Sequence, residues 1–363
     1  MRTGTVTWIS FRNFGTYLQA YALQRALQKL GYDNKVIDDA KVVAAFPQKK
    51  FSPVRILRSI PWLFPKRAEF NRKSAMVAAL YEDFKNTYID LDRSWDSTKE
   101  LDSTYDTFIA GSDQIWSPTA CFDDFYYLGF TDKKKIAYAP SLGTTVYPED
   151  RVKLARPFLA KFSSLSVREP QGAALLKDKF GLDAQVVADP TVLLTREDWD
   201  TLATDVKTDE QPYALCYFLT YNQAYIDYAK EYCKRRGLEM KLLIVRHDFI
   251  GLGADEVYTG PIGFLNAVKG AETVLTDSFH ATIFSMIFEK QFYTFKRFKD
   301  SSAASQNSRV ENLLLKVDLP ERLLDETSPV MDDAAIPYEQ VGAALAQMRS
   351  ESIDYLKNAL KRA

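Results

Sequence analysis

The sequence predicts an α/β protein with two Rossmann-like, doubly wound domains that face a cleft. Short β-rich runs alternate with helical segments along most of the 363 residues, which is the pattern of parallel sheets. The length suits two domains, and 46% hydrophobic residues can give each of them a core. Ligands of such sheets bind beyond the carboxyl ends of the strands, so the cleft between the halves is the expected site.

The N-terminal domain is expected to cover residues 1–194 and to open with a strand, a loop, a helix and a second strand. The strand is predicted at Thr5–Ser10, the helix at Tyr17–Leu30 and the next strand at Lys35–Ile37. The helix has apolar residues at helical spacing and stops before Gly31, a common helix terminator. The alternation continues with elements at Tyr105–Ala110, Lys135–Ala139, Leu165–Arg168, Pro170–Phe180 and Gln185–Ala188.

Residues 41–75 differ from this pattern and are interpreted as a basic, aromatic insertion. They hold nine Lys or Arg and one acidic residue, Glu69, with Phe51, Trp62 and Phe64 among the basic side chains. A basic segment interleaved with aromatic residues can lie on an anionic membrane surface. The alternative is a solvated insertion whose apolar side chains pack on the domain.

The second half repeats the strand–helix alternation. Residues 195–211 are polar and acidic and are predicted to link the domains. The C-terminal domain is expected at residues 212–337, followed by a C-terminal helix at 338–363. Its elements are predicted at Tyr213–Leu219, Gln223–Arg235, Lys241–Val245, Ile262–Lys269, Thr273–Leu275, Ala281–Phe288 and Phe292–Phe295.

Composition and missing motifs exclude several classes of function. A net charge of −1 argues against a nucleic-acid binder, and three scattered cysteines without a CxxC argue against a disulfide framework or a zinc ribbon. Two histidines give a transition metal too few ligands, so we expect neither a metal nor a cofactor, although a carboxylate-only Mg²⁺ site stays open. The first strand follows the N-terminus directly and no apolar stretch could span a membrane, so we expect a cytoplasmic protein.

The most specific local signal is the segment TDSFHAT at residues 276–282. A strand ends there, a polar turn follows and an apolar helix begins, so His280 is expected near a helix N-terminus. Backbone N–H groups at that position favour anions, and a histidine beside a bound anion can donate to it or deliver a proton. The alternative is a capping or structural histidine. His247, which follows a strand of the same half, is the second acid–base candidate.

Polar residues after the strands of the N-terminal half are candidates for binding sugar hydroxyls. Ser112, Asp113 and Gln114 follow a strand after Gly111. The alternative is an Asx turn in which Asp113 caps a helix, and both interpretations can hold together. Asn13 precedes Gly15 between the first strand and helix, where a glycine lets a ligand approach the backbone. Neither segment is a dinucleotide-binding or P-loop motif.

Several cations follow strands that lead to the expected cleft. Arg168 could clamp a carboxylate or phosphate, or instead form a surface or interdomain ion pair with a nearby acid. Lys296, Arg297 and Arg309 are further candidates that are individually weak.

These motifs together resemble the polysaccharide pyruvyl transferase family. The resemblance rests on NFGTYLQAYALQRAL, GSDQIW, KIAYAPSLG, SVREPQGAALL, VVADPTVLL and TDSFHATIFSMIF, which occur in family order from about residue 5 to 320. It implies a fold like that of GT-B glycosyltransferases. It also implies transfer of pyruvate from phosphoenolpyruvate to a sugar as a ketal, in surface polysaccharide biosynthesis. The residue at the family's catalytic histidine is His280, and Arg168 matches the arginine of the SVRE segment.

The resemblance assigns further residues and also shows departures. Ser278 stands where the better-known branch has a donor-binding arginine, so Arg168, Arg246 or Lys296 is expected to neutralise the donor, with Ser278 and Phe279 beside it. Ala281 replaces the usual glycine after the histidine. The implied acceptor is a sugar or a lipid-linked oligosaccharide. The segment 41–75 would bring the enzyme to such an acceptor at the inner face of the membrane.

Two other functions remain open from the sequence. One is a glycosyltransferase that uses a nucleotide-sugar on the same fold, which would release a nucleotide instead of phosphate. The other is a non-catalytic sugar-binding relative, which the departures at Ser278 and Ala281 keep in consideration.

Overall fold

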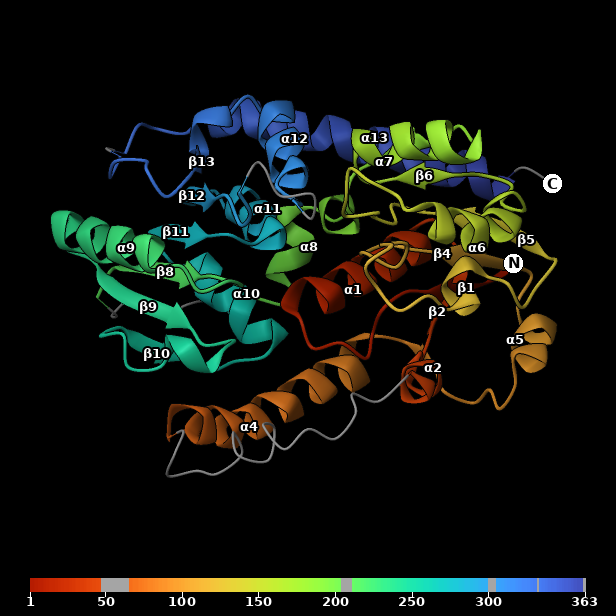
Figure 1. Ribbon diagram of the computed structural model, residues 1–363, viewed down its shortest axis with the longest axis horizontal. Coiled ribbons are helices and arrows are strands. Elements are labelled where there is room, and N and C mark those ends of the chain that lie inside the picture. Colours follow the sequence, from red (N-terminus) through yellow and green to blue (C-terminus); the bar gives the residue numbers. More distant parts are fainter. Residues whose placement is uncertain (47–64, 204–210, 300–304, 332, 362–363) are drawn as a thin grey trace.

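Two parallel β-sheets organise the chain in this computed structural model, which describes residues 1–46, 65–203, 211–299, 305–331 and 333–361. Each sheet has helices packed on it, as Figure 1 shows, and the doubly wound α/β prediction is confirmed. The N-terminal sheet has the order β3-β2-β1-β4-β5, and the C-terminal sheet has the order β10-β9-β8-β11-β12-β13. Both sheets reverse their winding at their first strands, β1 and β8, and ligand sites form at such switch points.

The strands are short, and the central strands of both sheets are buried, as expected for parallel sheets covered on both faces. The N-terminal sheet consists of β1 (Arg2–Val6), β2 (Asp33–Ile37), β3 (Leu91–Asp92), β4 (Thr107–Ala110) and β5 (Lys134–Ala137). The C-terminal sheet consists of β8 (Tyr213–Tyr217), β9 (Glu239–Leu243), β10 (Asp255–Val257), β11 (Thr273–Thr276), β12 (Gln291–Phe295) and β13 (Leu323–Leu324). A separate pair, β6 (Ser166–Val167) and β7 (Gln185–Val186), extends the first half.

The helices of the N-terminal half include a long one in the segment interpreted as an insertion. They are α1 (Phe14–Lys29), α2 (Ala40–Ala45), α4 (Pro65–Tyr88), α5 (Thr98–Thr104), α6 (Glu149–Leu159), α7 (Pro170–Leu175) and α8 (Arg196–Asp200). Those of the C-terminal half are α9 (Gln223–Arg236), α10 (Pro261–Gly270), α11 (Phe279–Ile287), α12 (Ser308–Lys316) and α13 (Tyr338–Lys361).

One apolar core joins the two halves. Phe14 at the start of α1 stacks on Phe264 of α10, with ring centroids 4.7 Å apart, and both belong to a cluster that contains side chains from each half. Helix α13 adds a second connection: Leu345 packs in this shared cluster, whereas Leu356 packs against Leu23 of the N-terminal half. Figure 1 shows α13 running from the C-terminal half across to the N-terminal half. The shared core fixes the relative position of the loops that form the site.

Several sequence-based boundaries differ from the structure. The first strand ends at Val6 rather than Ser10, because residues 7–13 form the loop that reaches the site. The expected linker 195–211 begins with the short helix α8, whose capping box is formed by Thr195 and Asp198, and residues 204–210 lie outside the described residues. Within 41–75, residues 47–64 are likewise outside the described residues, and the segment's membrane contact stays a prediction. Among the described residues, no helix is both long and apolar enough to cross a membrane.

Candidate active site

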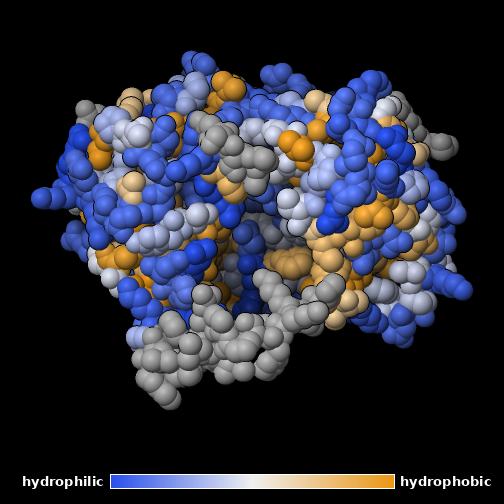
Figure 2. All heavy atoms as spheres, viewed as in Figure 1, coloured by the Kyte–Doolittle hydropathy of each residue, from blue (hydrophilic) through white to orange (hydrophobic). Residues whose placement is uncertain are grey.

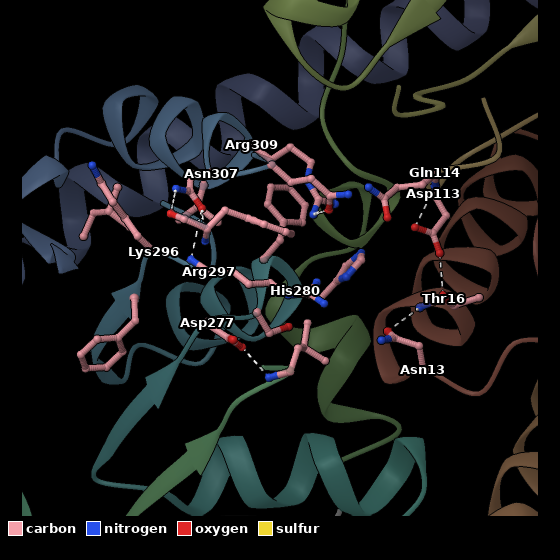
Figure 3. Close-up of a pocket in the computed structure, with 18 of the residues that line it drawn as sticks. Asn13, Thr16, Asp113, Gln114, Asp277, His280, Lys296, Arg297, Asn307 and Arg309 are labelled. Carbon is pink, nitrogen blue, oxygen red and sulfur yellow. Dashed lines mark hydrogen bonds between the residues drawn. The ribbon is translucent and has the colours of Figure 1, made fainter. Parts of the chain in front are cut away.

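A cavity of about 280 Å³ opens between the two halves, at the carboxyl ends of both sheets. Figure 2 shows the hollow at the centre of this face of the molecule. Its N-terminal wall comes from the loops after β1 and β4, and its C-terminal wall from the segments after β11 and β12 and from α12. In Figure 3, His280 lies between these walls, with Asn13, Thr16, Asp113 and Gln114 on one side and Asp277, Lys296, Arg297, Asn307 and Arg309 on the other.

His280 lies in the first turn of α11, as the sequence predicts. Ser278 is the N-cap residue, and its hydroxyl accepts a hydrogen bond from the Ala281 N–H at 3.4 Å. Ser278, Phe279 and His280 all line the cavity, so the positive end of the helix borders it. The residue is only 8% exposed, yet its side chain is part of the cavity wall rather than of an apolar interior.

The His280 ring is enclosed on two sides. Its Nε2 lies 3.4 Å from Oδ2 of Asp189. Its other nitrogen lies against Gly15, because a Cβ added to that glycine would sit 1.9 Å from Nδ1. Position 15 therefore requires glycine, because the imidazole occupies the space where any other residue would place its Cβ.

Asp189 joins His280 to a buried ion-pair cluster. Nη1 of Arg168 donates to Oδ2 of Asp189 at 2.5 Å, and its Nε donates to Glu169 at 3.2 Å. Burial by itself would raise the pKa of Asp189, but His280, Arg168 and a Thr191 hydrogen bond together hold it below its ordinary value. The carboxylate is thus charged at neutral pH.

Arg168 does not line the cavity. Its guanidinium lies behind the ring of Phe279, 4.8 Å from the ring centroid, in a small separate pocket. The structure therefore shows Arg168 in an ion pair with nearby acids, as the sequence left open, but both partners, Glu169 and Asp189, belong to the same half of the chain as Arg168. Its contact with a donor stays a prediction. Arg246 is also absent from the cavity wall, and its guanidinium pairs with Asp248 at 2.5 Å. His247 does not line the cavity either.

The cavity receives its positive charge from Lys296, Arg297 and Arg309. Within the part of the chain that the structure describes, Arg309 forms no ion pair with a carboxylate, and its buried Nε has no hydrogen-bond partner. Burial, with the nearby charge of Arg168, lowers the pKa of Arg309 to about 10, so it remains charged at neutral pH. Arg309 is partly buried, with its Nε enclosed, and a partly buried cation that pairs with no carboxylate would be stabilised by an anion in the cavity.

Asp277 is the acidic residue on the same wall. Its carboxylate accepts hydrogen bonds from the backbone N–H groups of Leu219 at 2.6 Å and Thr220 at 3.1 Å. Burial nevertheless raises its pKa to about 6. Asp277 therefore connects the segments after β8 and β11, and it adds less negative charge to the cavity in mildly acidic conditions.

The N-terminal wall carries most of the polar residues that the sequence predicted there. The Asn13 side chain caps α1 by accepting from the Gly15 N–H at 2.9 Å, and Asp113 accepts from the Thr16 hydroxyl at 2.5 Å. Gln114 also lines the cavity, and its buried Nε2 has no hydrogen-bond partner among the described residues. Ser112 does not line it, because its hydroxyl donates to the carbonyl of Ala139 at 2.7 Å.

The structure adds residues that sequence reasoning missed. Trp8 and the 39% exposed Phe11 pack edge to face in the wall, with ring centroids 5.3 Å apart. Their position in the loop between the first strand and the first helix could have indicated that they line the cavity. Asp189 carried no comparable signal, because its contact with His280 exists only in the folded chain.

No group of His, Cys, Asp and Glu side chains suited to a metal is found in the described ranges. The cavity brings together an imidazole at a helix N-terminus, a partly buried cation that pairs with no carboxylate of the described residues, and a polar wall opposite them. Such an arrangement can hold an anion and exchange a proton with it.

Comparisons with known proteins agree with this architecture. A family model described as polysaccharide pyruvyl transferase matches residues 13–297. No match is found among curated protein sequences. Among solved structures, UDP-GlcNAc 2-epimerase from Methanocaldococcus jannaschii, in complex with UDP-GlcNAc and UDP, is similar with a TM-score of 0.50, 11% identity and 99% coverage of both chains.

Two further structures have lower scores. UDP-GlcNAc 2-epimerase from Neisseria meningitidis, bound to UDP-GlcNAc, has a TM-score of 0.46, 10% identity and 100% coverage of both chains. A heptosyltransferase from E. coli with ADP has a TM-score of 0.42 and 12% identity over 96% of this chain and 100% of the other. At 11% identity, the likeness to the Methanocaldococcus jannaschii enzyme, with its TM-score of 0.50, concerns the fold alone.

Proposed function

The chain belongs to the polysaccharide pyruvyl transferase family, a family of transferases, and we propose on that premise that it moves pyruvate from phosphoenolpyruvate to a sugar. The product is a ketal that bridges two sugar hydroxyls, formed during surface polysaccharide biosynthesis. The observation that carries the proposal is that His280 lines the same cavity as Arg309, a partly buried cation without a carboxylate partner among the described residues.

The charge of the cavity suits this donor. Phosphoenolpyruvate has a carboxylate and a phosphate, and such groups are held by guanidinium groups and by helix N-termini. Arg297 and Arg309 line the cavity together with Ser278 at the start of α11. Lys296 is a third cation at the same wall. These residues take the place of the donor-binding arginine that the better-known branch has at position 278.

His280 is then the general acid. A proton passes from the imidazolium to the methylene carbon of phosphoenolpyruvate, which becomes the methyl group and leaves an oxocarbenium-like centre at the neighbouring carbon. The first sugar hydroxyl adds to that carbon and loses its proton. The phosphate leaves with its bond electrons, and the second hydroxyl closes the ketal and loses its proton in turn. Of the two protons released, one restores His280 and the other leaves with the phosphate.

The acceptor binds on the opposite wall. Asn13, Asp113 and Gln114 present amide and carboxylate groups that suit sugar hydroxyls, and Gln114 has a free donor there. Trp8 and Phe11 provide aromatic surface beside them, against which the apolar face of a sugar ring can pack. The acceptor is a sugar or a lipid-linked oligosaccharide.

The place of the reaction is the cytoplasm, at the inner face of the membrane. The support is the composition of residues 41–75, with nine basic residues and one acidic residue among aromatic side chains. Co-sedimentation with vesicles of anionic or neutral lipid tests this part separately. Binding to anionic vesicles alone is the expected result, and failure to bind either kind contradicts it.

The reaction is tested by following phosphate release from phosphoenolpyruvate with a panel of glycosides, with His280→Ala as the inactive variant. We expect acceptor-dependent release of phosphate, a pyruvylated product in the mass spectrum, and loss of both with a folded H280A protein. Release of a nucleotide from a nucleotide-sugar would instead identify a glycosyltransferase. Sugar binding without turnover of either donor would identify a binding protein.

A further inference from the structure

We propose that Asp189 is the positioning residue of His280. In this arrangement Asp189 holds a proton on Nε2 of the neutral imidazole and leaves Nδ1 to exchange protons with the ligand. The catalytic part of this inference rests on the proposed function, but the arrangement itself does not.

The Asp189 carboxylate is held in place by groups other than His280. Its Oδ1 accepts hydrogen bonds from the Thr191 N–H at 3.0 Å and from the Thr191 hydroxyl at 2.7 Å. Its Oδ2 accepts from Nη1 of Arg168 at 2.5 Å, and the residue is only 2% exposed. Three donors therefore fix both oxygens, as expected for a group that orients another side chain.

Nε2 of His280 is buried and has one partner. That partner is Oδ2 of Asp189, which lies 3.4 Å away. The contact does not have the geometry of a hydrogen bond, and Nε2 forms no hydrogen bond to another described residue. A buried imidazole nitrogen that faces a charged carboxylate is stabilised when it carries a proton. The separation is longer than a strong hydrogen bond, and such contacts often tighten only when the substrate is bound.

Nδ1 is the nitrogen left for chemistry. Nδ1 lies against Gly15, and Asn13 and Thr16 on either side of that glycine line the cavity. Unlike Nε2, Nδ1 is not a buried atom that lacks a hydrogen-bond partner. If Nε2 keeps its proton throughout, Nδ1 gives its own proton to the donor carbon and later takes one from a sugar hydroxyl. Asp189 does not take part in either transfer and stays charged.

Nitrogen-15 NMR of the histidine side chains tests the arrangement without any turnover. The chain has two histidines, so His247→Gln assigns both sets of signals. We expect the neutral His280 ring to carry its proton on Nε2 in the wild type. Asp189→Asn should change that signature, since an amide can donate to Nε2 as well as accept from it. A proton on Nδ1 in the wild type, or the same tautomer in D189N, would overturn the proposal.

The control and the kinetic experiment separate positioning from folding. Asp132→Asn removes an exposed carboxylate that pairs with Lys161 at 2.9 Å, and it should change neither the His280 signals nor turnover. D189N should lower kcat by about 100-fold or more and leave KM for phosphoenolpyruvate within about threefold, because loss of the tautomer affects the transition state and not donor binding.

A second variant keeps the test decisive if D189N does not fold. Thr191→Val removes one of the hydrogen bonds that fix the carboxylate and should produce a smaller change of the same kind. An unaltered His280 signature in T191V, if D189N does not fold, overturns the positioning role. Altered signatures in a protein that transfers no pyruvate contradict the proposed function alone.

Discussion

Replacing Gly15 by alanine should inactivate the enzyme without unfolding it. The new Cβ would lie 1.9 Å from Nδ1, 2.3 Å from Cγ and 2.5 Å from Cε1 of His280, where real Cβ atoms essentially never approach within 3.0 Å. Either the imidazole or the start of α1 must therefore move by at least about 1 Å. The histidine ring is the softer of the two, because α1 is anchored by the Asn13 cap and by Phe14 in the shared core.

The size of the effect follows from that displacement. A misplacement of about 1 Å at a reacting group costs about 100-fold in rate, so kcat of G15A should fall by about two orders of magnitude. Stability should change much less. Alanine is favoured over glycine in a helix by about 1 kcal/mol, which offsets part of the strain from the displaced ring.

The assay is acceptor-dependent phosphate release from phosphoenolpyruvate, with thermal unfolding of the same samples. Gly342→Ala is the matched control, because that glycine lies in α13 and an added Cβ would meet no atom within 4 Å. G342A should keep full activity and gain slightly in melting temperature. A G15A protein with wild-type kcat would refute the close packing of the His280 ring against Gly15.

Three further predictions concern the cavity walls. Arg309→Met should raise KM for phosphoenolpyruvate by about 10- to 100-fold, which is the contribution of a charged hydrogen bond. It should also raise the melting temperature, because it removes a partly buried charge without a carboxylate partner among the described residues. Wild-type KM in R309M would exclude Arg309 from donor binding. The pKa of Asp277 is raised to about 6 in the folded protein from 3.8, so its stabilising contribution is full below about pH 4 and is lost as the pH rises through about 6. Between pH 4 and 7 the free energy of unfolding should therefore fall by on the order of 3 kcal/mol through this group. Asp277→Asn should remove that fall in urea unfolding, and an unchanged pH dependence would contradict the raised pKa of Asp277. Gln114→Leu should raise the acceptor KM by about tenfold and leave the donor KM unchanged, because the buried Nε2 bonds no other described group; an equal change in both constants would refute a purely acceptor-side role.

The sequence could predict the fold and half of the site because their signals are local. His280, Asn13 and Gln114 each follow a strand of a parallel sheet, and such residues converge on one edge wherever the strands run in order. The helix start at Ser278 is also local, since the N-cap hydrogen bond joins residues three apart.

The remaining features depend on contacts that have no local signal. Arg168 follows a strand as well, but its strand belongs to the small β6–β7 pair, and the ring of Phe279 separates the guanidinium from the cavity. Asp189 and His280 come from different halves and meet only because the shared core brings the halves together. Gly15 belonged to a recognised motif, but the reason for glycine there is the imidazole that fills its side-chain space.

The most direct test of the central claim is a crystal structure of the protein with phosphoenolpyruvate and no acceptor. The account predicts the anion in the cavity at the start of α11, in contact with Ser278 and Arg309, and its methylene carbon within reach of Nδ1 of His280. Phosphoenolpyruvate bound away from this helix, or absent at a saturating concentration, would contradict it.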